Sequence, residues 1–328
     1  MALPWFWRSF TPKIRDANRR GVVGSIASLE RVTLGGSPQW ILIRGQSTKS
    51  PVLLFLHGGP GMPSMYLAHR FQRSLEQDFV VVHWDRRGAG KSYTKDTPPD
   101  KMRVSQEVAD TVELTKMLVA RFGQSKIYLV GHSYGSYLGM IVAARYPDLF
   151  HAYVGVGQLA YTGEMNRAIQ DRWITAQATA AHETKLLEQL RAGKPINREK
   201  WLFRFGGELR SKRSFTALLN IGLRAPEYSM VDVVRLVRGL NFTHREMKFD
   251  AIDGNLIDAV PQVVIPVYFF TGRYDYTDPY VLTEEYARRL EAPRKELVWF
   301  EESAHFPFLE EPDNFARQMG KVVLDTRQ

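Results

Sequence analysis

Short apolar runs alternate with stretches of helical spacing along this chain, and that alternation limits the possible folds more than any other feature. Three of the runs are VLLFLH (52–57), FVVVHWD (79–85) and KIYLVGH (126–132). Residues 64–77 and 105–122, which lie between them, have helical spacing. Continuous apolar runs are typical of strands buried on both faces, and helical connections favour a parallel sheet with right-handed crossovers. The pattern therefore predicts an α/β fold.

Further segments extend the predicted sheet to eight strands. Residues 26–34 and 39–45 alternate and predict an antiparallel hairpin that turns at GGSP. The remaining predicted strands are 152–158, 267–272 and 296–301, and helices are expected near 280–291 and 313–324. We thus expect a mostly parallel eight-stranded sheet with helices on both faces.

The region from 161 to about 250 has a different pattern. It contains amphipathic helical stretches, including 167–191 and 229–239, and no clear buried strand. We interpret 161–250 as a helical cap inserted into a core made of 25–160 and 251–328, after an N-terminal segment, 1–24.

Composition narrows the possible chemistry. The 328 residues are 44% hydrophobic and include no cysteine, which excludes disulfides, thiolate metal sites and a cysteine nucleophile, and fits a cytoplasmic protein. The net charge of +9 is spread along the chain, so we expect no nucleic-acid partner. Pro4 and Arg8 interrupt the aromatic opening MALPWFWRSF, so we expect no stable membrane insertion. The oligomeric state stays open.

One motif combines a strand, a sharp turn and a helix. Gly131-His132-Ser133-Tyr134-Gly135 follows the apolar run at 126–132 and precedes a helical stretch. Such a turn needs glycines for close backbone approach, and it lifts the serine oxygen toward the positive end of the helix dipole. We interpret Ser133 as a nucleophile; the alternative is a serine that only caps the helix.

A serine nucleophile needs a base and a group that orients the base. His305 follows the last predicted strand, whereas the other histidines after Ser133 head a strand or lie in the helical insertion. Asp275 follows the strand at 267–272, while Asp278 precedes Pro279 and is better explained as a helix N-cap. We therefore predict a triad of Ser133, Asp275 and His305.

The segment LHGGPGMP (56–63) has the composition of a loop that binds an oxyanion. It follows a predicted strand, and its glycines let the backbone approach a tetrahedral intermediate. The predicted donors are the backbone N–H groups of Gly59 and of Tyr134, the residue after the nucleophile.

Three other patterns fail as cofactor or metal motifs. GAGKS (88–92) lacks the first glycine of a phosphate-binding loop, GVGQLA (155–160) is outside the first strand–helix unit, and HETKL (182–186) lacks a second histidine. We therefore expect no cofactor and no metal.

The segments HGGPG, WDRRGAGKS, GHSYGS, GRYD and SAHFPFLEEP together resemble the α/β-hydrolase superfamily, in its proline iminopeptidase-like branch of serine peptidases. The resemblance spans residues 57–312 and implies the same triad and oxyanion donors. In that branch the residue after the nucleophile is typically tryptophan, whereas here it is Tyr134. Cap carboxylates hold the substrate's α-amino group in such peptidases. The family's cap segment is absent, so Glu164 and Glu227 are the candidates here.

The resemblance implies a serine hydrolase with acyl-enzyme chemistry, an aminopeptidase acting on short peptides. A carboxylesterase or amidase whose cap selects another small-molecule substrate is the first alternative. The second alternative is a non-catalytic binding protein on the same scaffold.

Overall fold

The computed structural model describes residues 9–161, 163–211, 214–252 and 254–326. Its centre is one eight-stranded sheet with the strand order β1-β2-β4-β3-β5-β6-β7-β8. The strands are β1 (Ile26–Leu34), β2 (Ser37–Gly45), β3 (Val52–Leu56), β4 (Val80–Asp85), β5 (Ile127–His132), β6 (Phe150–Val156), β7 (Val267–Gly272) and β8 (Lys295–Phe300). Only the β1–β2 and β2–β4 pairs are antiparallel. The predicted α/β fold with a mostly parallel sheet is confirmed.

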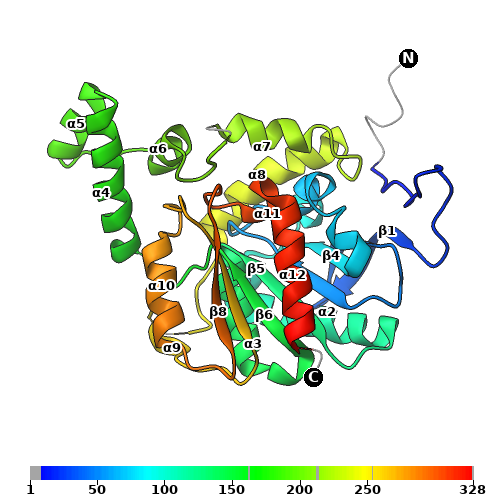
Figure 1. The fold of residues 1–328 in the computed structure, drawn as a ribbon. Helices are drawn as coiled ribbons and strands as arrows, with labels where there is room; N and C mark the ends of the chain where they lie inside the picture. Colours follow the sequence, from blue (N-terminus) through cyan, green and yellow to red (C-terminus); the bar gives the residue numbers. More distant parts are fainter. Residues whose placement is uncertain (1–8, 162, 212–213, 253, 327–328) are drawn as a thin grey trace, which may run out of the picture.

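Helices cover both faces of this sheet (Figure 1). One face packs against α2 (Val104–Phe122), α3 (Tyr134–Arg145) and α10 (Tyr280–Arg289). The other face packs against α1 (Leu75–Asp78), α11 (Pro307–Glu310) and α12 (Pro312–Thr326). Along β3, Leu54 contributes to the first core and Leu53 and Phe55 to the second, because successive side chains of a strand point to opposite faces. Both faces are apolar, as the continuous runs predicted.

The chain between β6 and β7 forms helices and contains no named strand among its described residues. They are α4 (Glu164–Ala180), α5 (Thr184–Arg191), α6 (Arg198–Phe205), α7 (Phe215–Gly222), α8 (Met230–Glu246) and the short α9 (Leu256–Ala259). In Figure 1, α4 and α5 project from the body, while α6, α7 and α8 lie above the sheet. Buried residues of α4, α5 and α6 form a small core of their own. The division into core and cap stays a prediction.

The helix predicted at 64–77 is wrong in its length. The segment forms a 3₁₀ helix, η2 (Met65–Arg70), and then the single turn α1. Residues 65–68 are all buried, so the first turns of the segment have no solvent-facing side of the kind that a surface α-helix has. Shorter 3₁₀ segments are η3 (Gly90–Ser92), η4 (Pro99–Lys101) and η5 (Pro147–Leu149).

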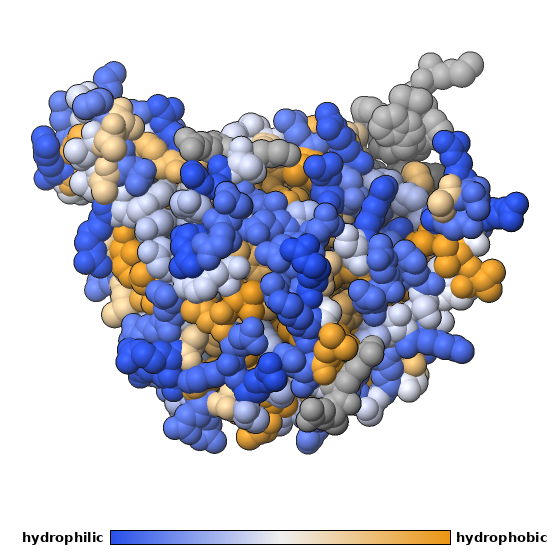
Figure 2. All heavy atoms as spheres, in the orientation of Figure 1, coloured by the Kyte–Doolittle hydropathy of each residue, from blue (hydrophilic) through white to orange (hydrophobic). Residues whose placement is uncertain are grey.

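Part of the predicted N-terminal segment is described. The Phe10 N–H donates to Pro226 O at 2.9 Å, and Arg15 pairs with Gly21; residues 1–8 lie outside the described residues. Within the described residues, no helix has the length and apolarity needed to cross a membrane. The face in Figure 2 is mostly hydrophilic, with apolar side chains scattered over it.

Candidate active site

Ser133 lies at a strained turn between β5 and α3. Its φ of 54° and ψ of −124° are unusual for a residue with a side chain. A Cβ on Gly131 would lie 2.3 Å from Gly135 O, and a Cβ on Gly135 would lie 2.2 Å from Leu56 O. Both glycines of the motif are therefore required by close backbone contacts. The turn holds Ser133 at the carboxyl end of β5.

The glycine loop after β3 packs against this turn. A Cβ on Gly58 would lie 3.0 Å from the Cβ of Ser133. Gly59 has a φ of 112°, and a side chain there would meet the backbone nitrogens of Gly61 and Met62. Tyr134 is the first residue of α3, where N–H groups lack a partner within the helix. The two predicted oxyanion donors thus belong to segments that meet at Ser133, and their role stays a prediction.

His305 and Asp275 form a buried pair beside the turn. The His305 Nδ1 atom lies 2.8 Å from Asp275 Oδ2, and both side chains have 2% or less of their surface exposed. Asp275 Oδ1 accepts the backbone N–H groups of Thr277 and Asp278. A Cβ on Gly157 would lie 2.7 Å from His305 Nδ1. Gly157 belongs to the GVGQLA segment, so that glycine leaves space for the pair.

Asp278 is not the helix N-cap that its sequence context favours. The N-cap of α10 is Pro279, and no side chain caps this helix. The Ser133 hydroxyl instead donates to Asp278 Oδ2 at 3.3 Å, and His305 Nε2 lies 3.9 Å from the same oxygen. Asn166, on α4, donates to Asp278 Oδ1 at 3.3 Å. The carboxylate therefore contacts the serine directly.

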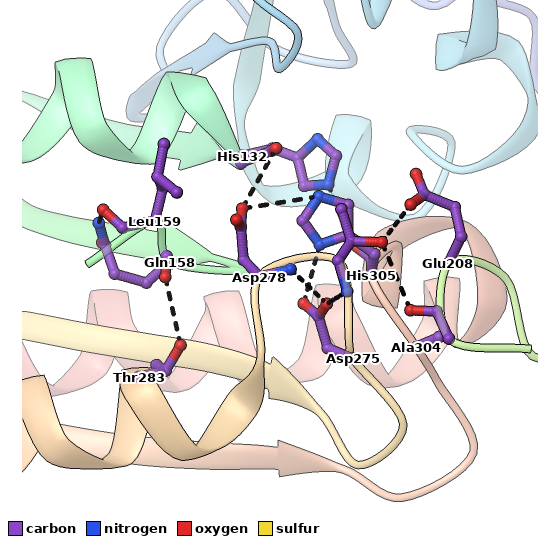
Figure 3. A network of polar contacts seen from close by, with 12 residues as sticks. His132, Gln158, Leu159, Glu208, Asp275, Asp278, Thr283, Ala304 and His305 are labelled. Atoms are coloured by element: carbon purple, nitrogen blue, oxygen red, sulfur yellow. Dashed lines mark hydrogen bonds and ion pairs between the residues drawn. The ribbon is translucent and has the colours of Figure 1, made fainter. Parts of the chain in front are cut away.

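Glu208 is the second carboxylate that the sequence analysis missed. It follows α6, and its backbone oxygen accepts the His305 N–H at 3.0 Å. Its side chain accepts a hydrogen bond from Thr277. In the view of Figure 3, Glu208 and Asp278 lie on opposite sides of the His305 ring, with Asp275 below it. No motif surrounds Glu208; the Gly206-Gly207 pair before it is the only local hint of a close turn.

These carboxylates change one another's proton affinity. Burial lowers the pKa of His305, but the Asp275 carboxylate, with further help from Glu208 and Asp278, outweighs it and raises the pKa to about 10. Burial raises the pKa of Asp278 to about 7, although His305 opposes the shift. Burial likewise raises the pKa of Glu208 to about 7. His132, whose ring centroid lies 4.7 Å from that of His305, has its pKa lowered well below the usual value by burial.

A cavity of about 460 Å³ opens onto Ser133 and His305. Polar lining residues include Gln170, Glu199 and Glu208. Its apolar lining comes from the glycine loop, η2, the start of α11 and the helices above the sheet: Met62, Leu67, Leu202, Phe203, Phe215, Leu218, Leu240, Phe306 and Phe308. The cavity can therefore hold a small molecule with an apolar body beside the serine and a polar group near Glu208.

The two carboxylates predicted to bind a substrate amine lie elsewhere. Glu227 is 2% exposed, its carboxylate accepts a hydrogen bond from Thr11, and it is not among the residues that line the cavity. Glu164, the first residue of α4, is exposed and does not line the cavity either. Position within a helical segment does not indicate which side chains face inward, so the structure does not support either assignment, and both stay predictions.

A family model described as the alpha/beta hydrolase fold matches residues 51–312. The chain belongs to the α/β-hydrolase family. It is 34% identical over 306 residues to the "Probable aminopeptidase YbaC" of Bacillus subtilis, an alignment that covers 90% of this chain and 96% of that relative. The "Proline iminopeptidase" of Chitinophaga pinensis is 33% identical over 132 residues, which cover 40% of this chain and 42% of that protein. These relatives put this hydrolase in the proline iminopeptidase-like branch.

Solved α/β-hydrolase structures share the fold. A proline iminopeptidase from Mycobacterium smegmatis superposes with a TM-score of 0.64 at 20% identity, covering 91% of this chain and 98% of that one. A proline iminopeptidase-related protein from Thermus thermophilus gives a TM-score of 0.62 at 20% identity, covering 92% and 98%. Within the described part of this hydrolase, no group of three or more histidine or acidic side chains is arranged to hold a metal ion.

Proposed function

We propose that this hydrolase is a serine aminopeptidase of the proline iminopeptidase type, acting on short peptides through an acyl-enzyme. The observation that carries the proposal is the buried 2.8 Å contact between His305 and Asp275 in the wall of the cavity that contains Ser133. An imidazole oriented by a carboxylate is the base that a serine nucleophile requires. We also propose that residues 161–250 act as the cap over this cavity.

In the proposed reaction, Ser133 Oγ attacks the scissile carbonyl carbon while its proton passes to His305 Nε2. The N–H groups of Gly59 and Tyr134 stabilise the oxyanion, and losing one such donor typically costs about 3 kcal/mol of transition-state stabilisation. His305 then gives the proton to the leaving amine as the C–N bond breaks. A water molecule, deprotonated by His305, attacks the acyl carbon, and His305 then returns the proton to Ser133 Oγ as the acyl C–O bond breaks and the carboxylic acid leaves.

Glu208 supports an amine-bearing substrate. It lines the cavity and lies close to His305, whose backbone N–H donates to the Glu208 backbone oxygen. An ammonium group that leaves water for a partly enclosed site needs a counter-charge. We propose that Glu208 supplies that counter-charge, in place of Glu164 and Glu227. The relatives named for aminopeptidase and proline iminopeptidase activity agree with an amine-bearing substrate.

The test compares L-proline 4-nitroanilide with a 4-nitrophenyl acyl ester, using wild-type protein and Ser133→Ala. We expect turnover of the anilide, labelling of wild type by a fluorophosphonate probe, and loss of both in the variant. Ester turnover without anilide turnover would favour the carboxylesterase alternative. Correctly folded wild type that is neither labelled nor active would favour a non-catalytic binding protein.

A further inference from the structure

The Ser133 hydroxyl donates its hydrogen bond to a group other than the catalytic base of the proposed triad. It donates to Asp278 Oδ2 and not to His305. The same Asp278 oxygen lies 3.9 Å from His305 Nε2, the nitrogen that has to accept the serine proton. One carboxylate oxygen therefore contacts the nucleophile and faces the base at the same time.

Asp278 is fixed in this place by its neighbours. Its backbone N–H donates to Asp275 Oδ1 at 3.0 Å, and Asn166 donates to its second carboxylate oxygen. It caps no helix, and only 7% of its surface is exposed. Burying a carboxylate costs free energy, and no helix-capping role accounts for this one. Its contact with a nucleophile therefore indicates a function there.

The charges around the imidazole do not balance. The ionisable groups that face His305 and Asp278 come from β5, the loop after α6 and the loop after β7, and they are His132, Glu208 and Asp275. Burial keeps His132 neutral. Three carboxylates thus surround one imidazole, which favours its protonated form. A protonated imidazole cannot take the serine proton, so the free enzyme is poorly prepared for catalysis.

We propose that Asp278 is a positioning residue that keeps the Ser133 hydroxyl away from His305 until a cationic group of the substrate enters the cavity beside Glu208. The inference rests on the proposed serine hydrolase function and adds a reason for substrate choice. A positive charge beside Glu208 makes the imidazolium less favourable, so His305 releases its Nε2 proton to water. The neutral nitrogen then accepts the Ser133 hydroxyl. Substrates without the cation leave the hydroxyl on Asp278.

The raised proton affinities agree with this arrangement. Three neighbouring carboxylates raise the pKa of His305 to about 10 against the effect of burial. Burial raises the pKa of Asp278 to about 7. Neutral substrates should therefore be turned over faster as the pH rises through the pKa of His305. Removing the Asp278 charge should lower that pKa and move the rise to lower pH.

The experiment uses two esters that differ at one ring position, L-proline benzyl ester and cyclopentanecarboxylic acid benzyl ester. We would measure kcat and KM for both from pH 6 to 11, with the spontaneous hydrolysis of each ester subtracted, using wild type, Asp278→Ala and Asp278→Asn. Asp258→Asn, which removes an exposed carboxylate paired with Arg289 outside the cavity, is the control. Benzyl alcohol release is the readout, and fluorophosphonate labelling with thermal unfolding checks the fold.

We expect wild type to prefer the proline ester in kcat. Both Asp278 variants should reduce that preference about tenfold or more, mainly by raising kcat for the neutral ester. The acidic limb of the pH–rate profile for the neutral ester should move to lower pH by about one unit. If the alanine variant does not fold, the isosteric asparagine variant decides the question. Asp258→Asn should change neither quantity.

Equal slowing of both esters, a preference changed less than tenfold or an unmoved acidic limb would overturn the inference and leave Asp278 a structural residue. Failure of the proposed function looks different. It would appear in wild type itself, as absent anilide turnover or as turnover that survives Ser133→Ala. If only the anilide is not turned over, the neutral ester still tests Asp278; turnover that survives Ser133→Ala would overturn both proposals.

Discussion

Two regions of this hydrolase bury charged side chains, and they balance those charges differently. Around His305, three carboxylates face one imidazole. In the loop after β4, residues 86–92, each cation has its own acid, and the buried Asp85 before it accepts hydrogen bonds from Tyr228 and the Lys91 N–H. The pairs are Arg86 Nε with Glu107 Oε1 at 3.3 Å, Arg87 Nη2 with Asp110 Oδ2 at 2.9 Å, and Lys91 Nζ with Asp232 Oδ2 at 2.7 Å. Buried ion pairs hold segments of the chain together, whereas buried carboxylates without a cation of their own can bind a ligand or a proton.

The matched pairs explain the WDRRGAGKS segment in structural terms. Arg87 also donates to the backbone oxygens of Leu34 and Gly35, so it joins the β1–β2 turn to Asp110 on α2. Lys91 joins the loop to Asp232 on α8. The lysine that resembles part of a phosphate-binding loop is thus already paired. This region therefore joins α2 and α8 to the loop that follows β4.

The largest effect on activity is expected around His305, where three carboxylates face one imidazole. Asp275→Asn should lower kcat about 10⁴-fold, because the amide can no longer hold His305 in the orientation and tautomer that accept the serine proton. Steady-state kinetics on L-proline 4-nitroanilide gives the value. Asp258→Asn, which removes an exposed carboxylate paired with Arg289, is the control. A loss below tenfold would remove Asp275 from the proposed triad.

In the loop after β4, where each cation has its own acid, a substitution should lower stability and leave activity almost unchanged. Asp110→Ala leaves the buried Arg87 guanidinium without its partner, and breaking such a pair typically costs about 3 to 5 kcal/mol of unfolding free energy. Urea unfolding measures the loss. We expect kcat of the folded protein to change less than about threefold. A large fall in kcat at unchanged stability would contradict the division between the two regions.

Glu208→Gln should have a smaller effect, confined to cationic substrates. We expect kcat/KM for the proline anilide to fall about tenfold, because the ammonium loses its counter-charge. Removing this negative charge also lowers the pKa of His305, so the acidic limb of the pH–rate profile should move to lower pH. A parallel loss on a neutral acyl ester, with the limb unmoved, would argue against an amine-binding role.

The smallest effects belong to carboxylates that face neither region. Glu227→Gln and Glu164→Gln should each change kcat/KM for the proline anilide less than about twofold, since neither residue lines the cavity. Kinetics on purified variants would measure this. A rise in KM of tenfold or more for either variant would restore it as a substrate-binding candidate.

Most of the sheet could be predicted because its signals are local. β7 occupies the predicted residues 267–272, and the GHSYG turn lies between β5 and α3. A buried parallel strand needs an apolar run, and a strand-to-helix turn needs its glycines, whatever the rest of the chain does. The prediction of one helix over 64–77 was wrong because residues 65–68, which are all buried, belong to a 3₁₀ helix.

The candidate site was only partly predictable, because local rules gave Asp278 the wrong role. An aspartate before a proline and a helical stretch favours an N-cap. The observed partner is Ser133, 145 positions earlier in the chain. Glu208 has no local signal beyond the Gly206-Gly207 pair, and it reaches His305 only because the loop after α6 packs against the loop after β8.

The sequence by itself determined the layered α/β architecture, the turn that carries Ser133 and the residue types that can accompany it, because backbone geometry and burial leave marks within a few positions. Only the tertiary structure decided which carboxylates surround His305 and which of them contacts the serine. Charges interact through distance and burial, and those are set by how separate loops pack together, whatever their order along the chain.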